Sequence, residues 1–278
     1  MTIILDGEKV ASKIYKDLKP KISFLKKNDV QPKIAIVITS RDKRSFKYAQ
    51  MKKRKFNEKD VKAKIFEPHR QIEAERLINN LNTNNTYHGI FIQLPIDRPL
   101  NKSRILSKLD PRKDIDCMSP HSLGRLLIGK EIYTPANVEA LFQILRYYKI
   151  DINKKWGIIG KDNVLGRPLI SKLCAEGLKF SNFKPSSNFS NSKIIVSDVQ
   201  KIGYIKKNQV SKGSILLDNG NNYLKGKVYG DFDYRNVKET VHAVTPVPGG
   251  IGPVTVAVLL SNLIKAAINY IENTSEIL

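Results

Sequence analysis

The sequence is poor in cysteine and has no long uninterrupted hydrophobic run. Its 278 residues include two cysteines, Cys117 and Cys174. These are too few for a disulfide framework and lack the spacing of zinc ligands, so we expect no metal site. The most apolar stretch, Val254 to Ile268, is interrupted by polar residues that include Lys265, which argues against a membrane span. The first ten residues lack a basic leader followed by an apolar core. We therefore expect a cytoplasmic protein with no membrane partner.

Acidic residues are also scarce relative to basic ones. The 48 Lys and Arg residues outnumber the 26 Asp and Glu residues, which gives a formal net charge of +22. Such a charge can favour nucleic acids. However, the basic residues are spread along the chain, and the tightest cluster, Lys52–Lys55, is not accompanied by a DNA-binding or RNA-binding motif. We therefore expect no nucleic-acid partner, and binding through Lys52–Lys55 is kept as an alternative.

Apolar residues recur in alternating strand-like and helix-like patterns along the chain. The expected helices span Val10–Leu25, Ser45–Glu58, Ile72–Leu81, Val138–Tyr148, Gly166–Glu176 and Thr255–Ile271. The expected strands span Lys33–Thr39, Ala63–Phe66, Gly89–Gln93, Trp156–Gly160, Lys193–Val196 and Ser214–Leu217. The polar segment Ser181–Asn191 is predicted to be a loop. This alternation predicts mainly parallel sheets with helices on both faces.

The two series of elements predict an α/β protein of two domains with parallel-rich sheets and a cleft between them. The first domain is expected to span residues 1–118, with the C-terminal helix at 254–278 packing back on it. The second domain, residues 119–253, contains a strand, a glycine-bearing turn and a helix in succession. That succession is typical of a Rossmann-like dinucleotide-binding domain.

Tyr48 and Lys52 are candidate reactive residues on one helix. They are four positions apart, so their side chains project from the same helical face. A phenol beside an amine can hold the amine near a reacting centre, and a lowered pKa would suit the amine to proton transfer. The alternative is a surface lysine whose aliphatic stem packs against the tyrosine, and the spacing alone favours that alternative.

Polar side chains at the end of an apolar strand and in a nearby loop are further candidates. Gln93 ends the strand GIFIQ, at the edge where ligands meet an open α/β sheet. Asp114 and Asp116 follow in the loop segment KDIDC. Two such carboxylates could bind a cation, cap a helix, or pair with a guanidine-like ring edge, as in a pterin. Composition alone favours helix capping.

Two glycine-bearing segments are candidate ligand-binding loops. Gly160 follows a strand directly, and Gly166 opens the next helix, whose free N–H groups suit a phosphate. Only these two glycines are present, so the signal is weaker than a full G-x-G-x-x-G. In the segment Thr245–Val256, TPVPGGIGPVTV, the run of prolines and glycines is expected to be neither strand nor helix, and Pro253 is expected in the first turn of the next helix. The glycines would let the backbone approach a flat ligand closely.

Together these segments resemble the bifunctional methylenetetrahydrofolate dehydrogenase/methenyltetrahydrofolate cyclohydrolase family. The resemblance runs through nearly the whole chain in the family's order. It includes LDGEKVA at the start, S-x-x-Y-x-x-x-K at 45–52, GIFIQLPI at 89–96, PRKDID at 111–116, GRP at 166–168, GKVYGDFDY at 226–234 and TPVPGGIGPVTVA at 245–257.

The resemblance implies both the activity and the roles of individual residues. It implies oxidation of methylenetetrahydrofolate with NADP, hydrolysis of the methenyl product, and a homodimer formed through the nucleotide domain. Lys52 resembles the catalytic lysine, Tyr48 its stacking and orienting partner, Gln93 its hydrogen-bonding partner, and Asp116 the carboxylate that grips the pterin. The folate-site loop would be Pro248, Gly249 and Gly250, and the cofactor contacts Gly160, Lys161, Asp162, Gly166, Arg167 and Asn221.

The sequence departs from the family pattern mainly in the cofactor half. Asp162 and Gln200 stand where the family has a serine and a glycine, and Asn221 lies in an altered strand end. In the folate half, Cys117 replaces a glycine. These departures leave NAD as an alternative cofactor. They also leave two alternative functions, a cyclohydrolase without dehydrogenase activity and a catalytically silent ligand-binding protein.

Overall fold

The computed structural model describes residues 2–160 and 164–275, which form two compact units. The three-stranded unit comprises Tyr15–Arg125, Glu131–Pro135 and the chain from Leu259 onward. The six-stranded unit comprises the residues up to Ile14, Leu126–Lys130 and Ala136–Val258. Each unit is built on a parallel sheet. The predicted fold class, α/β with parallel-rich sheets, is confirmed.

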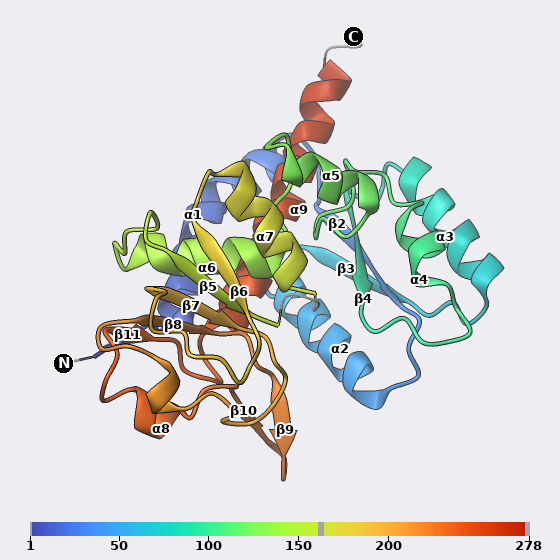
Figure 1. The fold of residues 1–278 in the computed structure, drawn as a ribbon. Helices are drawn as coiled ribbons and strands as arrows, with labels where there is room; N and C mark the ends of the chain where they lie inside the picture. Colours follow the sequence, from blue (N-terminus) through green and yellow to red (C-terminus); the bar gives the residue numbers. More distant parts are fainter. Residues whose placement is uncertain (1, 161–163, 276–278) are drawn as a thin grey trace. The chain divides into compact units, whose positions relative to one another are not determined.

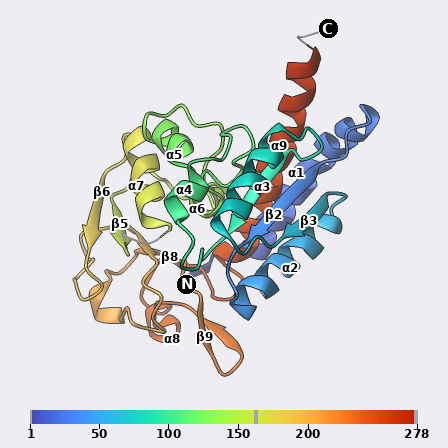
Figure 2. The same ribbon diagram turned by 90° about the vertical axis from the view of Figure 1, so that its right-hand side faces the viewer.

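In the three-stranded unit, helices cover both faces of the sheet (Figures 1 and 2). Strand β2 (Lys33–Ile38) lies between β3 (Lys62–Phe66) and β4 (Gly89–Gln93), and all three are parallel. Successive side chains of a strand point to opposite faces. One face packs its alternate residues against α3 (Gln71–Thr83) and α4 (Lys102–Leu106). The other face, with Phe91 and Gln93, contacts α2 (Lys43–Asn57).

Helix α2 begins where its sequence provides a cap. The side chain of Asp42 accepts a hydrogen bond from the backbone N–H of Arg44 at 3.1 Å, which satisfies one of the unpaired N–H groups of the first turn. The loop before it is held by Asp97, whose carboxylate accepts from the Ser40 hydroxyl at 2.8 Å and from the Arg41 N–H at 3.0 Å. The start of α2 is therefore fixed relative to the loop that follows β4.

The six-stranded unit has the strand order of a doubly wound nucleotide-binding sheet. The order is β1-β11-β8-β7-β5-β6, and all pairings are parallel. The strands are β1 (Ile3–Ile4), β5 (Trp156–Ile159), β6 (Phe180–Phe183), β7 (Ile194–Ser197), β8 (Ile215–Asp218) and β11 (Ala243–Val244). From β5 the chain goes to β6 on one side and then crosses to β7 on the other. The switch point, where ligands bind in such sheets, therefore lies between β5 and β7.

The remaining elements are mostly helical. They are α1 (Gly7–Lys27), α5 (Pro120–Leu127), α6 (Ala136–Tyr147), α7 (Gly166–Ala175), the short 3₁₀ helix η1 (Lys207–Gln209), α8 (Tyr234–Val237) and α9 (Ile251–Ser275). Strands β9 (Asn222–Leu224) and β10 (Lys227–Tyr229) form a separate antiparallel hairpin (Figure 1). The helices and strands expected from the sequence are all present, with ends that differ by a few residues.

Two local expectations are corrected by the structure. The segment predicted as a loop, Ser181–Asn191, begins with residues of β6, a partly exposed edge strand whose polar residues hid it. In the proline- and glycine-rich run, α9 begins earlier than expected, at Ile251. Its Pro253 lies in the first turn, where no N–H is needed. Strand β1 pairs with β11, which groups the first residues with the six-stranded unit. The functional domain boundaries at residues 118 and 253 stay a prediction.

Helix α9 is the most hydrophobic long segment that the structure describes. Its segment Ile251–Glu272 has a mean hydropathy of 1.8 and is long enough to cross a membrane by length and composition. However, 61% of this window is buried inside the protein. A core helix meets the same criteria, so the segment does not require a membrane.

Candidate active site

The amine of Lys52 is held by residues of strand β4. Its Nζ donates a hydrogen bond to Oε1 of Gln93 at 2.9 Å and lies 4.3 Å from the centroid of the Phe91 ring. Nε2 of Gln93 in turn donates to the carbonyl of Leu94 at 2.8 Å, so the amide is oriented with its oxygen toward Lys52. Gln93 is buried and Lys52 partly buried. Helix α2 thus directs Lys52 against the sheet.

This environment changes the acid–base behaviour of the amine. Burial lowers the pKa of Lys52 to about 8, and the negative charge of Asp116 opposes that shift. An amine whose pKa lies near the working pH can both accept and donate a proton during a reaction. Tyr48 lies one helical turn before Lys52 and is partly buried as well. The alternative of a solvated surface lysine is therefore wrong, and Lys52 is withdrawn from any exposed basic cluster.

The two carboxylates of the KDIDC loop have different surroundings. Asp114 is buried and accepts hydrogen bonds from the N–H groups of Met118 at 2.9 Å and Ser119 at 2.8 Å, just before α5. Asp116 is partly buried and interacts electrostatically with Lys52. Asp114 therefore holds the turn that precedes α5, whereas the cap of that helix is Ser119, whose Oγ accepts from the Ser122 N–H at 3.0 Å. Asp116 is the carboxylate whose charge acts on the amine.

The path of this loop explains why Asp116 comes near Lys52. The loop runs beside β4, with a parallel bridge between Ile90 and Asp114 and a hydrogen bond from the Ile90 N–H to the Lys113 carbonyl at 2.8 Å. Asp116 follows this bridge by two residues, and its charge acts on the Lys52 amine. Cys117 then turns the chain with a φ of +53°, in the left-handed region that glycine adopts at least cost. The glycine expected at this position in the family is thereby explained.

Thr39 and Phe91 are residues that sequence reasoning did not single out. Thr39 follows β2, where Ile38 pairs with Gln93, and its buried hydroxyl has no hydrogen-bond partner among the described residues. Phe91 lies two positions before Gln93, so the period of a strand could have placed both on one face. The contact of its ring with an amine from another helix gives no signal in the sequence.

In the six-stranded unit, the predicted glycine-bearing turn lies at the switch point of the sheet. Gly160 follows β5 directly with a φ of +94°, a conformation that requires glycine. Gly166 is buried as the first residue of α7, and Arg167 is exposed beside it. Lys161 and Asp162 lie outside the described residues. Gly160 at the end of β5 and the first residues of α7 stand where a sheet of this type binds the phosphates of a dinucleotide.

A buried carboxylate of the chain lies at the same switch point. Asp198, directly after β7, accepts hydrogen bonds from the side chains of Gln200 at 2.6 Å and Asn219 at 3.2 Å and from the backbone N–H of Leu165, next to α7. Burial raises the pKa of Asp198. This arrangement uses one of the N–H groups near the start of α7 and adds negative charge. Asp198 is therefore the residue here that fits a phosphate-bearing cofactor least well.

The other residue expected to bind the cofactor, Asn221, lies after β8 and directly before β9. Asn221 is exposed, and its N–H donates to Oε1 of Gln200 at 3.3 Å. Gln200 itself has a φ of +62°, which accounts for the glycine found at this place in the family. Gln200 thus links the segment that follows β7 to the segment that follows β8. Both segments contain residues that depart from the family pattern.

The predicted folate-site loop is tightly packed within its own unit. Gly249 has a φ of +100°, and its carbonyl accepts from the Gly7 N–H at 2.8 Å. A Cβ on Gly250 would lie 2.5 Å from the carbonyl oxygen of Pro246. Both glycines are therefore required by the backbone itself. Pro248 is exposed in the same loop.

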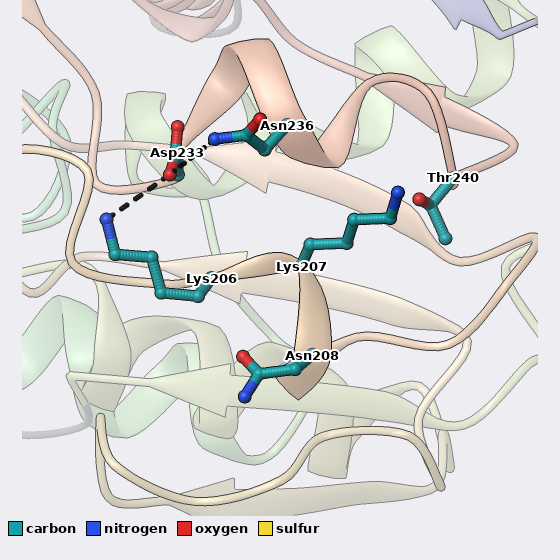
Figure 3. A pocket seen from close by; sticks show the side chains of 6 residues that line it. All are labelled: Lys206, Lys207, Asn208, Asp233, Asn236 and Thr240. Atoms are coloured by element: carbon teal, nitrogen blue, oxygen red, sulfur yellow. Dashed lines mark hydrogen bonds and ion pairs between the residues drawn. The ribbon is translucent and has the colours of Figure 1, made fainter.

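A surface hollow in the six-stranded unit does not coincide with any predicted site residue. It has a volume of about 590 Å³ and is lined by Lys206, Lys207, Asn208, Asp233, Asn236 and Thr240, between η1 and α8 (Figure 3). The ammonium of Lys206 pairs with the Asp233 carboxylate at 3.2 Å, and that carboxylate also accepts from Asn236 (Figure 3). These polar groups satisfy one another, which is typical of a structural surface.

A partly buried amine in one unit and a nucleotide-binding type of sheet in the other define a two-unit α/β enzyme. The model of the catalytic domain of tetrahydrofolate dehydrogenase/cyclohydrolase matches residues 5–116, and that of its NAD(P)-binding domain matches residues 135–271. The chain therefore belongs to the tetrahydrofolate dehydrogenase/cyclohydrolase family.

Curated relatives and solved structures agree with this assignment. The chain is 34% identical to the bifunctional protein FolD of Thermodesulfovibrio yellowstonii, with 95% of this chain and 96% of that protein covered. It is similar to the crystal structure of the bifunctional dehydrogenase/cyclohydrolase from Campylobacter jejuni, with a TM-score of 0.92, 31% identity and coverage of 97% and 99%. A Trypanosoma brucei enzyme complexed with NADP and an inhibitor gives a TM-score of 0.90, 25% identity and coverage of 97% and 98%. Because the matches span both domains, the alternative of a cyclohydrolase alone is not favoured.

Proposed function

We propose that this enzyme oxidises 5,10-methylenetetrahydrofolate with NADP and hydrolyses the resulting 5,10-methenyltetrahydrofolate to 10-formyltetrahydrofolate. The observation that carries the proposal is the Lys52 amine, hydrogen-bonded to Gln93, with its pKa lowered to about 8. The family membership of both domains supports the two activities. The T. brucei relative complexed with NADP supports the choice of cofactor.

In the hydrolytic step, Lys52 is proposed to act as the general base and general acid. The oxygen of a water molecule bonds to the methenyl carbon, and the neutral amine of Lys52 accepts a proton from that water. The bond from this carbon to N5 of the folate then breaks as the carbonyl forms, and N5 keeps the electron pair and takes up a proton. One proton is released overall. Gln93 keeps the amine in place, and a pKa near 8 lets Lys52 take and return protons near neutral pH.

The remaining folate contacts are proposed for residues near Lys52 and for residues that match the folate-site motifs of the family. Asp116 would grip the N–H groups of the pterin edge as a two-pronged acceptor. Tyr48 would stack on the folate and orient Lys52, since it shares the helical face of that residue. Pro248, Gly249 and Gly250 would line the folate site with a backbone that their packing makes stiff.

The cofactor is proposed to bind at the switch point of the six-stranded sheet. Gly160, Gly166 and Arg167 would hold its phosphates together with Lys161 and Asp162, which lie between them in the sequence. Asn221, directly before β9, would also contact the cofactor. When bound, NADP accepts a hydride from the methylene carbon. The acidic Asp198 would weaken this binding, and NAD remains the alternative cofactor.

We also infer a cytoplasmic homodimer that associates through the six-stranded unit, with no nucleic-acid or membrane partner. The exposed apolar residues of its hairpin, Tyr223, Leu224 and Tyr229, support a surface that another copy could cover. Sedimentation at micromolar concentration would detect a particle of twice 31.5 kDa. A single species of the monomer mass would contradict the dimer.

The proposed activities are tested separately by following NADPH formation and the loss of methenyltetrahydrofolate absorbance. Lys52→Met is expected to reduce hydrolysis at least a hundredfold, within the range that a positioned acid–base group contributes, while NADPH formation continues. Lys47→Met, which removes an exposed lysine of the same helix, is the matched control. Hydrolysis by Lys52→Met at the rate of the control would contradict the proposed role of Lys52. Absence of NADPH or NADH formation by the unaltered enzyme would contradict the dehydrogenase.

A further inference from the structure

Phe91 lies directly beneath the amine that the proposed hydrolysis uses. On β4, Phe91 and Gln93 are two positions apart, and they pair with Ile36 and Ile38 of β2. Side chains two apart on a strand point to the same face. Lys52, from α2, contacts both of them, with Nζ 2.9 Å from Oε1 of Gln93 and 4.3 Å from the Phe91 ring centroid. One strand therefore provides both partners of the nitrogen.

The face of an aromatic ring attracts a cation. A phenylalanine ring carries negative charge density on its face, and an ammonium within about 6 Å of the centroid gains most when both groups are shielded from water. Phe91 is 5% exposed, so its ring is shielded. An aliphatic side chain of similar bulk would shield the amine equally without attracting its charge.

The two contacts also restrict the orientation of the nitrogen. An ammonium has three N–H donors. One is used by Oε1 of Gln93, and the ring of Phe91 occupies a second direction. The two contacts thus fix the position of the Lys52 nitrogen as well as its burial.

We propose that Phe91 is a positioning residue for the cyclohydrolase reaction, which holds the Lys52 ammonium over its ring while Gln93 fixes it from the side. The inference rests on the proposed function of Lys52. The charged group that acts on Lys52 is Asp116, from the loop beside β4. On helix α2 itself, Tyr48 lies one turn before Lys52, and Lys53, Arg54 and Lys55 directly follow Lys52.

Replacing Phe91 by leucine separates attraction from shielding. Phe91→Leu keeps an apolar side chain under the amine but removes the attraction for the ammonium form. The pKa of Lys52 should then fall, and the midpoint of the pH–rate profile for hydrolysis should move about 0.5 to 1 unit to lower pH. Phe56→Leu is the matched control, because it removes a buried ring from α2 itself. The control should lose stability without moving the midpoint.

A residue that only fills space would lower the rate of hydrolysis and leave the midpoint unchanged. An unshifted midpoint in active Phe91→Leu would therefore overturn the proposal. If Phe91→Leu does not fold, a trifluorinated phenylalanine at position 91 keeps the ring shape and weakens its attraction for cations. The midpoint must then still fall, and an unchanged midpoint would again overturn the proposal.

A second readout does not depend on turnover. The rate at which acetic anhydride labels Lys52, followed by mass spectrometry as pH is varied, reports the pKa of the amine directly. A lower titration midpoint in Phe91→Leu than in Phe56→Leu supports the positioning role, and equal midpoints overturn it. If the unaltered enzyme failed to hydrolyse methenyltetrahydrofolate, the proposed function would fail, while this labelling would still decide whether Phe91 holds the ammonium.

Discussion

The ammonium of Lys52 and the side-chain oxygen of Gln93 are joined by a 2.9 Å hydrogen bond across 41 positions of the chain. The amide nitrogen of Gln93 is already used by the carbonyl of Leu94, so the oxygen is the atom left for Lys52. A neutral acceptor holds the ammonium without adding a negative charge. This distinction matters, because the lowered pKa of Lys52 depends on the balance between burial and the charge of Asp116.

Replacing Gln93 by glutamate should therefore impair hydrolysis through the charge alone. An opposite charge within hydrogen-bond distance raises the pKa of an amine by about 1 to 3 units. In Gln93→Glu, less of the neutral amine is present at pH 7, and the midpoint of the pH–rate profile should move to higher pH by at least about one unit. This direction is opposite to that expected for Phe91→Leu.

The control for added charge is Gln50→Glu, at an exposed position of α2, the helix that carries Lys52. It should leave the midpoint of hydrolysis where it is in the unaltered enzyme. The rates of both variants are measured from the loss of methenyltetrahydrofolate absorbance across pH 6 to 10. A Gln93→Glu midpoint equal to that of Gln50→Glu would show that Gln93 does not control the charge of Lys52.

The sequence was sufficient to predict much of this half of the site. Helical spacing placed Tyr48 and Lys52 on one face, and the end of the apolar run GIFIQ placed Gln93 at the carboxyl end of a strand. Two features depended on tertiary structure. The contact of Lys52 with Phe91 joins a helix and a strand far apart in sequence. Asp114 and Asp116 differ in role because Asp114 holds the turn just before α5, and that contact cannot be read from the sequence.

The fold was predictable where apolar patterns were strong and not where they were weak. The fully buried strands, such as β7, consist of apolar runs that indicate a strand directly. The edge strand β6 has the sequence FSNF and is only partly buried, so its pairing with β5 decides its conformation. Strand β1 has only two residues and is defined by its partner β11.

Asp114 and Asp116 should separate stability from function when each is changed to asparagine. Asp114 is 1% exposed and accepts two backbone N–H groups. The amide of Asp114→Asn can accept only one of them well, so the free energy of unfolding should fall by about 1 to 3 kcal/mol. Asp116→Asn should change stability little, but folate affinity should fall because a two-pronged charged acceptor is lost.

Chemical unfolding and folate binding are measured on both variants. Asp114→Asn that remains folded should bind folate close to normally, and Asp116→Asn should unfold at nearly the same denaturant concentration as the unaltered enzyme. Each variant thus controls for the other. The reverse pattern, a stability loss in Asp116→Asn and a binding loss in Asp114→Asn, would contradict the assignment of the two carboxylates.

Asp198 should limit the affinity for NADP. Its carboxylate lies at the switch point and accepts from the Leu165 N–H, in the region proposed for the phosphates. Asp198→Asn removes the charge and keeps the shape, so NADP should bind about three- to tenfold more tightly, the effect of one partly screened charge. The gain should grow as pH rises and the native carboxyl ionises. Fluorescence titration gives both affinities, and Glu239→Gln, an exposed carboxylate of the same unit, is the control. Equal affinities at pH 8 would contradict this role.

His88 should make the three-stranded unit less stable in acid. Its Nδ1 accepts the Lys33 N–H at 3.2 Å, and burial, with the charge of Lys113, lowers its pKa to about 4. A lowered histidine pKa means that the folded state prefers the neutral ring, so stability is lost as pH falls from about 6.5 toward 4. Between pH 7.5 and 5 this costs about 2 kcal/mol of unfolding free energy. His88→Asn keeps the acceptor and should lack this loss, whereas the exposed control His121→Asn should keep it. Equal acid sensitivity in all three proteins, measured by chemical unfolding, would exclude His88 as its source.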